Sequence, residues 1–376
     1  MVALTSQNTC PAKFIHLDLP TTAEDSETAV LMRLREAWTR IHKKNGAASP
    51  DDISNYLDSL SDGAVPRDAV NALRDKAKRF YARRQEKLAP LAHLKSDERR
   101  AVLSAARQGH AAGVVTRDQM EERIADLHAA YPWLAPASTA VMRHMRTHTL
   151  AKVAPFHTAP LILIGPPGIA KSSWARDLAK VFEVPEIDID IGATNGGTFA
   201  ISGTERGWGS AAPGRLVTTM LRHRTANPLV IVDEIDKIPE QVHTTKGGSL
   251  PGAFEVLKSM IEPSTARNWT CPYYQIPFDL SAVSWIMTTN SIDHLPEAFL
   301  DRCTVVALGH PTRDQLAAAG VRMIKASVDE DWQDLANSVL NEALHASGKH
   351  HRVLSLRAVS RMVERIAAAI EEPRLI

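Results

Sequence analysis

Residues 165–173, GPPGIAKSS, have the composition of a phosphate-binding loop. In the pattern G-x-x-x-x-G-K-[ST], backbone N–H groups cradle the phosphates, the lysine reaches the β- and γ-phosphates, and the hydroxyl contacts Mg²⁺. Two glycines allow the tight turn, and the cation and the hydroxyl follow it. We therefore predict that the loop binds a nucleotide through Gly165, Pro166, Pro167, Gly168, Ile169, Ala170, Lys171, Ser172 and Ser173.

One position departs from this pattern, because Ala170 stands where glycine normally precedes the lysine. Alanine is a good helix former, so it suits a residue that enters the helix after the loop. It would fail only if the backbone had to take a positive φ at that position. We expect the alanine to be tolerated.

Two adjacent carboxylates, Asp233 and Glu234, end a second apolar run, LVIVDE. In nucleotide hydrolysis one carboxylate holds the magnesium ion with its water, and another polarises the attacking water. We predict that Asp233 and Ser172 serve Mg²⁺ and that Glu234 is the catalytic base. The expected ligands are therefore ATP and Mg²⁺.

These residues need a scaffold of alternating strands and helices. The apolar runs LILIG, EIDIDIG, PLVIVDE and AVSWIMTTN are short and are separated by longer helical stretches, which indicates a parallel sheet with crossover helices. We predict an α/β P-loop core over 151–310 and a helical lid over 311–376, preceded by an all-helical domain over 26–150. Residues 1–25 are polar without a clear period and are expected to be loose.

The N-terminal helical domain contains one strongly basic helix. From Pro66 to about Leu88 the spacing places Val70, Leu73, Ala77 and Phe80 inward. Its segment Arg67–Lys87 carries eight lysines and arginines against three acidic residues. Such a run is either a solvated helix face or a docking face for nucleic acid or an acidic partner.

Another helix is expected over SPDDISNYLDSL, and capping boxes at Thr116–Gln119 and Thr312–Gln315 open two more.

Composition sets the broad class. The chain has 376 residues, of which 44% are hydrophobic and 23% charged, and a net charge of +1, so any nucleic-acid signal must be local. Three cysteines lie far apart without metal spacing, which indicates a reducing compartment. No secretory signal is evident, and the run LILI is far shorter than the ~20 residues that span a membrane. We expect a cytoplasmic protein without a membrane partner.

From about residue 156 to 376 the sequence resembles the AAA+ ATPases, and in particular the ATPase module of Lon proteases. The resemblance rests on the phosphate loop and its acidic partner, on the stretch EIDIDIGATNGGTFAISGTERGWGSAAPGRLVTTML, and on DEIDKI, AFEVLKSMIEP and YYQIPFDLSAVSWIMTTNSIDHLPEAFLDRC. It implies a ring, usually of six subunits. The sequence ends shortly after the lid, so we expect an ATPase without the Lon peptidase.

The resemblance also implies roles for single residues. Asn290 would be sensor 1, which positions the attacking water. Arg302 would be an arginine finger that reaches the γ-phosphate held by the neighbouring subunit; the alternative is a surface ion pair. Arg357 would be the sensor-2 arginine at the start of a lid helix, with Arg361 as the competing candidate. The planar arginine fork suits both jobs because it grips phosphate oxygens in a bidentate way.

Trp208 falls where the family carries the pore-loop aromatic that grips an unfolded polypeptide. Gly209 replaces the hydrophobic residue that normally follows, and Trp208 could instead pack in the core or at a subunit interface. Trp269 is a weaker candidate for a second axial loop.

Three functions stay open: a ring ATPase that remodels or threads protein, an ATP-driven nucleic-acid motor or loader, and an ATP-controlled assembly switch that recruits an effector protein.

Overall fold

The computed structural model describes residues 8–19, 26–43, 67–148, 153–191, 198–207, 211–238, 242–243, 249–250, 252–348 and 355–371. Its contacts divide the chain into two compact units, Leu17–Leu103 and the remainder, Met1–His16 with Ser104–Ile376. We describe each unit by itself. The predicted division into four segments stays a prediction.

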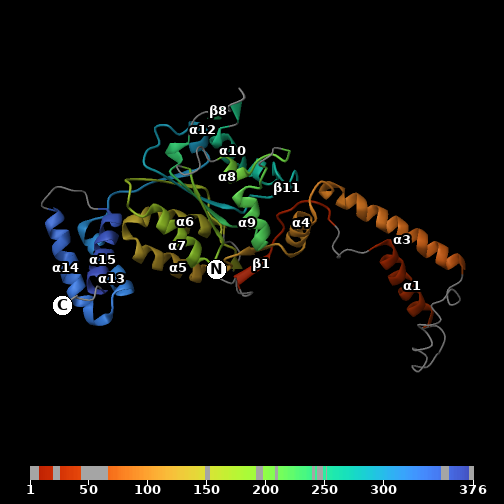
Figure 1. The fold of residues 1–376 in the computed structure, drawn as a ribbon, viewed down its shortest axis with the longest axis horizontal. Helices are drawn as coiled ribbons and strands as arrows, with labels where there is room; N and C mark the ends of the chain where they lie inside the picture. The colour runs from red at the N-terminus through yellow and green to blue at the C-terminus, as the bar shows by residue number, and fades with distance from the viewer. Residues whose placement is uncertain are drawn as a thin grey trace. The chain divides into compact units, whose positions relative to one another are not determined.

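The larger unit is built on a five-stranded sheet, drawn in Figure 1. Its strands lie in the order β13-β5-β12-β7-β6, and all neighbouring pairs are parallel. Their bounds are β5 Leu161–Ile164, β6 Glu186–Asp190, β7 Leu229–Asp233, β12 Ser284–Thr289 and β13 Thr304–Ala307. The predicted parallel sheet is confirmed, and the carboxyl ends of its strands form one edge.

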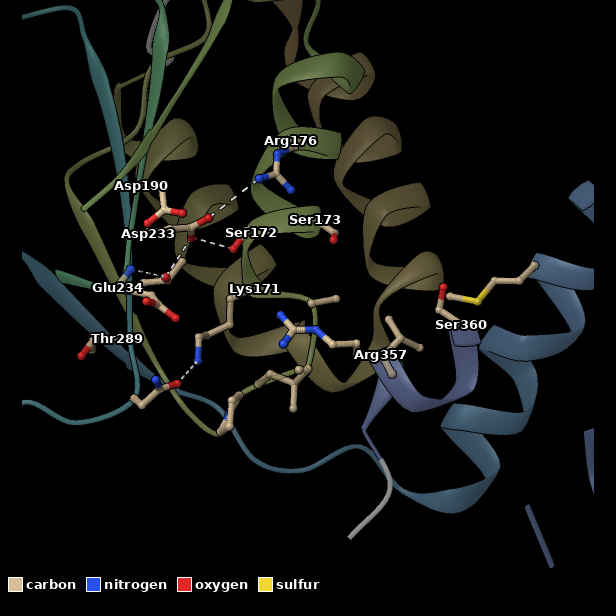
Figure 2. Close-up of a pocket in the computed structure, with 18 residues that line it drawn as sticks. Lys171, Ser172, Ser173, Arg176, Asp190, Asp233, Glu234, Thr289, Arg357 and Ser360 are labelled. Carbon is tan, nitrogen blue, oxygen red and sulfur yellow. Dashed lines mark hydrogen bonds and ion pairs between the residues drawn. The ribbon is translucent and has the colours of Figure 1, made fainter. Parts of the chain in front are cut away.

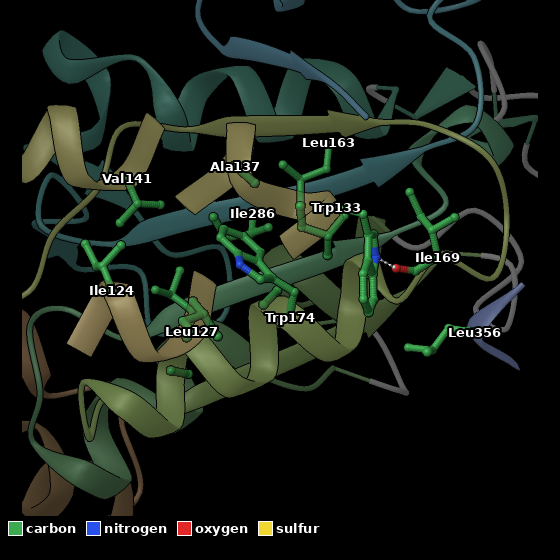
Figure 3. Close-up of a cluster of buried hydrophobic side chains, with 14 of the residues drawn as sticks. Ile124, Leu127, Trp133, Ala137, Val141, Leu163, Ile169, Trp174, Ile286 and Leu356 are labelled. Carbon is green, nitrogen blue, oxygen red and sulfur yellow. Dashed lines mark hydrogen bonds between the residues drawn. The ribbon is translucent and has the colours of Figure 1, made fainter. Parts of the chain in front are cut away.

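Three helices cover one face of this sheet (Figure 1): α5 (Arg117–Ala130), α6 (Ala135–His148) and α7 (Lys171–Val181). Every residue of β12 is buried, as expected for a central parallel strand with both faces covered. Figure 3 shows the core that results, one cluster of buried side chains that includes Ile124, Val141, Leu163 and Trp174. The capping box predicted at Thr116 is present at the start of α5.

Further elements connect and flank the sheet. They are α8 Thr198–Ser202, α9 Arg215–His223, η6 Ile235–Lys237, α10 Ala253–Ile261, α11 Pro263–Ala266, α12 Glu297–Leu300 and η4 Pro132–Leu134, with short strands β1 Thr9–Pro11, β2 His110–Ala112, β3 Val115–Thr116, β4 Val153–Ala154, β8 Val242–His243, β9 Ser249–Leu250, β10 Trp269–Thr270 and β11 Pro277–Phe278. The first strand differs from the loose segment that we expected over 1–25. It pairs with β2, and the nearby residues Phe14 and Ile15 are buried.

After the sheet the chain forms a three-helix bundle: α13 (Arg313–Ser327), α14 (Glu330–Gly348) and α15 (Leu356–Glu371). The capping box predicted at Thr312 and Gln315 opens α13. Gly320 allows close packing, since an added Cβ would stand 2.4 Å from a side-chain carbon of Leu340 on α14. The predicted helical lid is confirmed as a fold.

The smaller unit contains α1 (Glu27–Lys43), α3 (Arg67–Leu88) and η3 (Ala89–Leu91), and α4 (Ser96–Gln108) begins in it. Leu73 and Ala77 are buried as predicted, but Phe80 is 51% exposed. The inward prediction for Phe80 is wrong because the buried stripe continues to Arg84, a residue type that the apolar pattern does not include. The helix expected over residues 49–60 lies outside the described residues.

Candidate nucleotide-binding site

The phosphate loop joins β5 to α7 at the carboxyl edge of the sheet. Its lysine, Lys171, is the first residue of α7 and points back across the loop: Nζ donates to the carbonyl oxygens of Gly165 at 2.6 Å and Pro166 at 3.2 Å, and to Oδ1 of Asn290 at 3.1 Å. Burial lowers the pKa of the Lys171 ammonium, and the nearby acids oppose that shift. Three acceptors therefore hold the cation where the phosphates would bind.

Ala170 does not enter the helix as expected. It is the N-cap residue of α7, with φ 71° and ψ 33°, in the left-handed region. The expectation of a helical alanine is wrong, and the positive φ that we named as the unfavourable case is the one observed. The conformation costs an L-residue about 1–2 kcal/mol. Glu234 also has a positive φ, 58°, so two strained non-glycine residues border one site.

The carboxylate of Asp233 lies at the centre of a hydrogen-bond network (Figure 2). Its Oδ1 accepts from Oγ of Ser172 at 2.6 Å and from Oγ1 of Thr288 at 2.9 Å. The same Thr288 hydroxyl accepts the backbone N–H of Glu234 at 3.2 Å. Three elements, α7, β7 and β12, thus meet at the residues predicted to serve magnesium and catalysis.

Two residues of this network escaped the sequence interpretation. Thr288 lies near the end of β12, two positions before Asn290, which follows the strand, and a hydroxyl at a strand end was the available signal. Arg176 lies about one turn and a half after Lys171 on α7: its Nε donates to Asp188 at 2.8 Å, and a guanidinium nitrogen lies 3.8 Å from Oδ2 of Asp233. Asp188 raises the pKa of Arg176 through this hydrogen bond.

These side chains border a cavity of about 480 Å³, drawn in Figure 2. That volume is within the range of small-ligand and cofactor sites. It is lined by the loop residues Pro167–Ser173 and by Arg176, Asp190, Asp233, Glu234, Thr288, Thr289, Asn290, Met323, Leu356, Arg357 and Ser360. The last four come from the lid, so the cavity lies between the sheet edge and the lid.

Of the two lid arginines proposed as sensor 2, only Arg357 borders the cavity (Figure 2). Its backbone N–H also approaches the carbonyl of Gly168 at 3.4 Å. Arg361, one turn along α15, is exposed and does not line the cavity. The geometry favours Arg357 as the residue that would contact a bound phosphate.

Arg302 lies outside this cavity. It forms an ion pair in which Nε donates to Oε2 of Glu262 at 2.6 Å, and a second nitrogen donates to the carbonyl of Ala298. Both charged side chains are about one-third exposed. The surface ion pair that we had weighed as the alternative is therefore observed, and the side chain stays accessible from outside.

The proposed pore-loop residue, Trp208, lies outside the described residues. Trp269, the weaker candidate for a second axial loop, is in β10, pairs with Phe278 and is 8% exposed. The ring is buried at the β10–β11 hairpin, which argues against Trp269 as an axial-loop residue.

The oxygen atoms at the site suit magnesium. Mg²⁺ is commonly held by one or two carboxylates, with substrate phosphates and water completing its shell. The Asp233 carboxylate is one such ligand, and the Ser172 hydroxyl, which donates to it at 2.6 Å, adds a second oxygen beside the loop. The described residues contain no separate cluster of three or more His, Cys, Asp or Glu side chains suited to a metal. No helix within the described parts of the chain is long and apolar enough to cross a membrane.

Comparison with known proteins agrees with this geometry. Residues 161–309 match the family model "ATPase family associated with various cellular activities (AAA)". The chain is 30% identical to the mitochondrial Lon protease homolog of Yarrowia lipolytica over 209 residues, 55% of this chain and 17% of that protein. It is 25% identical to Lon protease 4 of Sorangium cellulosum over 343 residues, 90% of this chain and 41% of that protein.

A third relative, the Lon protease of Lawsonia intracellularis, is 30% identical over 185 residues, 49% of this chain and 21% of that protein. The chain thus spans less than half the length of these relatives. The matched segment begins at β5 and contains the phosphate loop, Asp233, Asn290 and Arg302. Residues 161–309 therefore form an AAA ATPase domain, homologous to the ATPase regions of Lon proteases.

Proposed function

We propose that this chain hydrolyses ATP with Mg²⁺ in a homo-oligomeric ring, of six subunits in the usual case, and uses the energy to remodel or thread a protein substrate. The observation that carries ATP hydrolysis is the juxtaposition of Lys171, Asp233 and Asn290 around one cavity. In this site Lys171 and the loop amides would bind the phosphates, and Arg357 would contact them from the lid. Glu234 would orient and deprotonate the attacking water.

A bound magnesium ion would supply charge neutralisation on the β- and γ-phosphates. Ser172 and Asp233 would hold it. Thr288 fixes the Asp233 carboxylate and the Glu234 backbone together, so the metal-binding and water-activating groups keep one geometry. Asn290, already bonded to Lys171, would hold the water on the far side of the γ-phosphate.

Arg302 supports the ring. A residue that contacts a neighbour's nucleotide must lie away from its own cavity and remain reachable, and Arg302 meets both conditions. Glu262 holds its guanidinium in the single chain, and we propose that assembly exchanges this partner for a phosphate of the adjacent subunit.

The described residues on either side of Trp208 support a role in substrate handling. Thr204 and Ala212 are joined by two hydrogen bonds, of 2.9 and 2.8 Å. Arg206 anchors one side, with its guanidinium 4.5 Å from the centre of the Tyr273 ring and Nε donating to the Tyr273 carbonyl at 3.1 Å. Fixed flanking residues would suit the transmission of a nucleotide-driven movement to Trp208.

The test is ATPase activity together with the unfolding of a labelled model protein. Trp208→Ala should retain ATPase activity and lose unfolding. Trp332→Ala removes a 46% exposed tryptophan from the lid and serves as the matched control, with both activities retained. Glu234→Gln should bind ATP without hydrolysing it. Full unfolding activity in Trp208→Ala would refute threading without touching the ATPase assignment.

We further propose that the chain has no peptidase activity of its own and that it acts in the cytoplasm. Casein incubated with the purified protein and ATP should stay intact, and cell fractionation checks the location. Casein fragments that appear with wild type and ATP, and not with Glu234→Gln, would contradict the first of these. Recovery of the protein in an organelle or envelope fraction would contradict the second.

The second candidate, a nucleic-acid motor, is favoured by one feature of α3. Its exposed side chains include Arg74, Lys76, Lys78, Arg79 and Arg83 beside the exposed ring of Phe80. Exposed cations with an aromatic ring suit a single strand, through phosphate contacts and stacking. Stimulation of ATPase by DNA or RNA, with binding that falls steeply with salt, would favour it. ATP-dependent assembly without translocation would favour the third candidate, a switch that recruits an effector.

A further inference from the structure

A buried tryptophan outside the nucleotide cavity is bonded directly to the phosphate loop. Trp133 lies in η4, between α5 and α6, and its indole Nε1 donates to the carbonyl oxygen of Ile169 at 2.8 Å (Figure 3). Trp133 is 7% exposed and Ile169 is 1% exposed, so water does not compete at this bond. The acceptor is a main-chain group in the middle of the loop.

The bonded carbonyl belongs to the peptide that links Ile169 to Ala170. The orientation of this peptide plane and the φ angle of Ala170 change together, and φ is 71°. An L-residue disfavours the left-handed region by about 5- to 30-fold relative to the right-handed one. The hydrogen bond from Trp133 favours the observed orientation by about 2- to 13-fold, a compensation of similar size.

The indole is itself held by its surroundings. Tyr131 packs edge-on against Trp133, with ring centres 5.9 Å apart and planes at 77°. The Tyr131 hydroxyl donates to Oδ2 of Asp177 on α7 at 2.6 Å. Trp133 is thus fixed relative to the same helix that begins at Lys171, so its donor stands at a defined place beside the loop.

We propose that Trp133 is a positioning residue that holds the Ile169–Ala170 peptide in its phosphate-binding orientation and thereby allows alanine at position 170. Trp133 does not line the cavity and would act on the nucleotide only through the loop. Glycine at position 170 would adopt the same φ without penalty, so the hydrogen bond from Trp133 would no longer be needed to hold the loop. The proposal rests on nucleotide binding at this loop.

The test is a double-mutant cycle with the affinity for the fluorescent analogue mant-ADP as readout. Trp133→Phe keeps a buried ring and removes the donor, and it should raise Kd about 3- to 10-fold. Ala170→Gly removes the left-handed penalty, and its own Kd is the reference for the second pair of the cycle. In the Ala170→Gly background, Trp133→Phe should change Kd less than about twofold, a non-additivity expected of directly coupled groups.

The chain offers a matched control in Trp174→Phe. Trp174 is buried in the same core, and its indole Nε1 donates to Oγ of Ser138 at 3.1 Å rather than to the loop. It should lower the unfolding midpoint as Trp133→Phe does and leave Kd unchanged. If Trp133→Phe does not fold, Tyr131→Phe, which releases the bond to Asp177, replaces it in the same cycle.

Two results would refute the proposed positioning role of Trp133. One is a Kd for Trp133→Phe equal to that of Trp174→Phe, and the other is a Trp133→Phe effect that is the same with alanine or with glycine at position 170. Neither result would contradict the ATPase assignment, because wild type and Trp174→Phe would still bind mant-ADP. Failure of wild type to bind any nucleotide would refute the ATPase itself and is read separately.

Discussion

The Thr288 hydroxyl leads to a sharp prediction, because it is hydrogen-bonded to both acidic residues of the pair Asp233 and Glu234. The side chain is 3% exposed on β12, donates to Oδ1 of Asp233 at 2.9 Å and accepts from the N–H of Glu234 at 3.2 Å. Thr288→Val keeps the shape of the side chain and removes both hydrogen bonds. The change therefore disconnects two residues without opening a cavity.

The magnitude follows from the two bonds. A hydrogen bond to a charged group is worth about 1.5–3 kcal/mol, and a buried N–H left unpaired costs about 1–3 kcal/mol. Ser172 still donates to Asp233, and the Asp233 side chain is 21% exposed, so water recovers part of the loss. We expect the free energy of unfolding to fall by about 2 kcal/mol. If the active geometry loses about 1.4–2 kcal/mol of support, kcat/KM falls about 10- to 30-fold.

The assay measures ATPase kinetics and denaturant unfolding for wild type, Thr288→Val and Thr288→Ser. The serine variant retains the hydroxyl and loses only a methyl group, so its kcat/KM should stay within about threefold of wild type. Equal kcat/KM for the valine and serine variants would refute the argument, because it would mean that the hydroxyl does not organise Asp233 and Glu234.

Further predictions concern Arg302, Lys171 and Glu262. Arg302→Ala should bind ATP and not hydrolyse it. Mixing it with Glu234→Gln should restore part of the ATPase activity, because a Glu234→Gln subunit supplies an intact Arg302 to a neighbour with an intact Glu234. If mixing restores no activity, Arg302 does not act in trans. In the free protein, burial lowers the pKa of Lys171 below the usual 10.5, and bound nucleotide phosphates would raise it again because they favour the charged ammonium. The affinity for nucleotide should therefore be highest at neutral pH and fall as pH rises through the lowered pKa of the free protein. Titration calorimetry in buffers of different ionisation enthalpy should detect proton uptake on binding at alkaline pH, and a pH-independent Kd would contradict it. Glu262→Gln should free Arg302 from its ion pair and leave ATP binding unchanged, which a mant-ADP titration checks.

The sequence by itself determined the sheet, the phosphate loop and the acidic pair. Short apolar runs are stable only when they are buried, so LILIG predicted a strand of the core. Glycine, lysine and a hydroxyl residue at fixed spacing fit few backbone arrangements, so the residues up to Ser172 predicted the loop and the start of the helix. The capping boxes at Thr116 and Thr312 were predictable because both partners of each box lie within one turn of local sequence.

Tertiary structure decided what local sequence could not encode. Ala170 is left-handed where the indole of Trp133, 36 residues before Ile169, bonds the carbonyl that precedes it. Thr288 bridges Asp233 and Glu234 only because β12 and β7 are neighbours in the sheet. Arg357 borders the cavity because the lid folds back over the loop. Such contacts join segments distant along the chain, and their distances exist only after the core has closed.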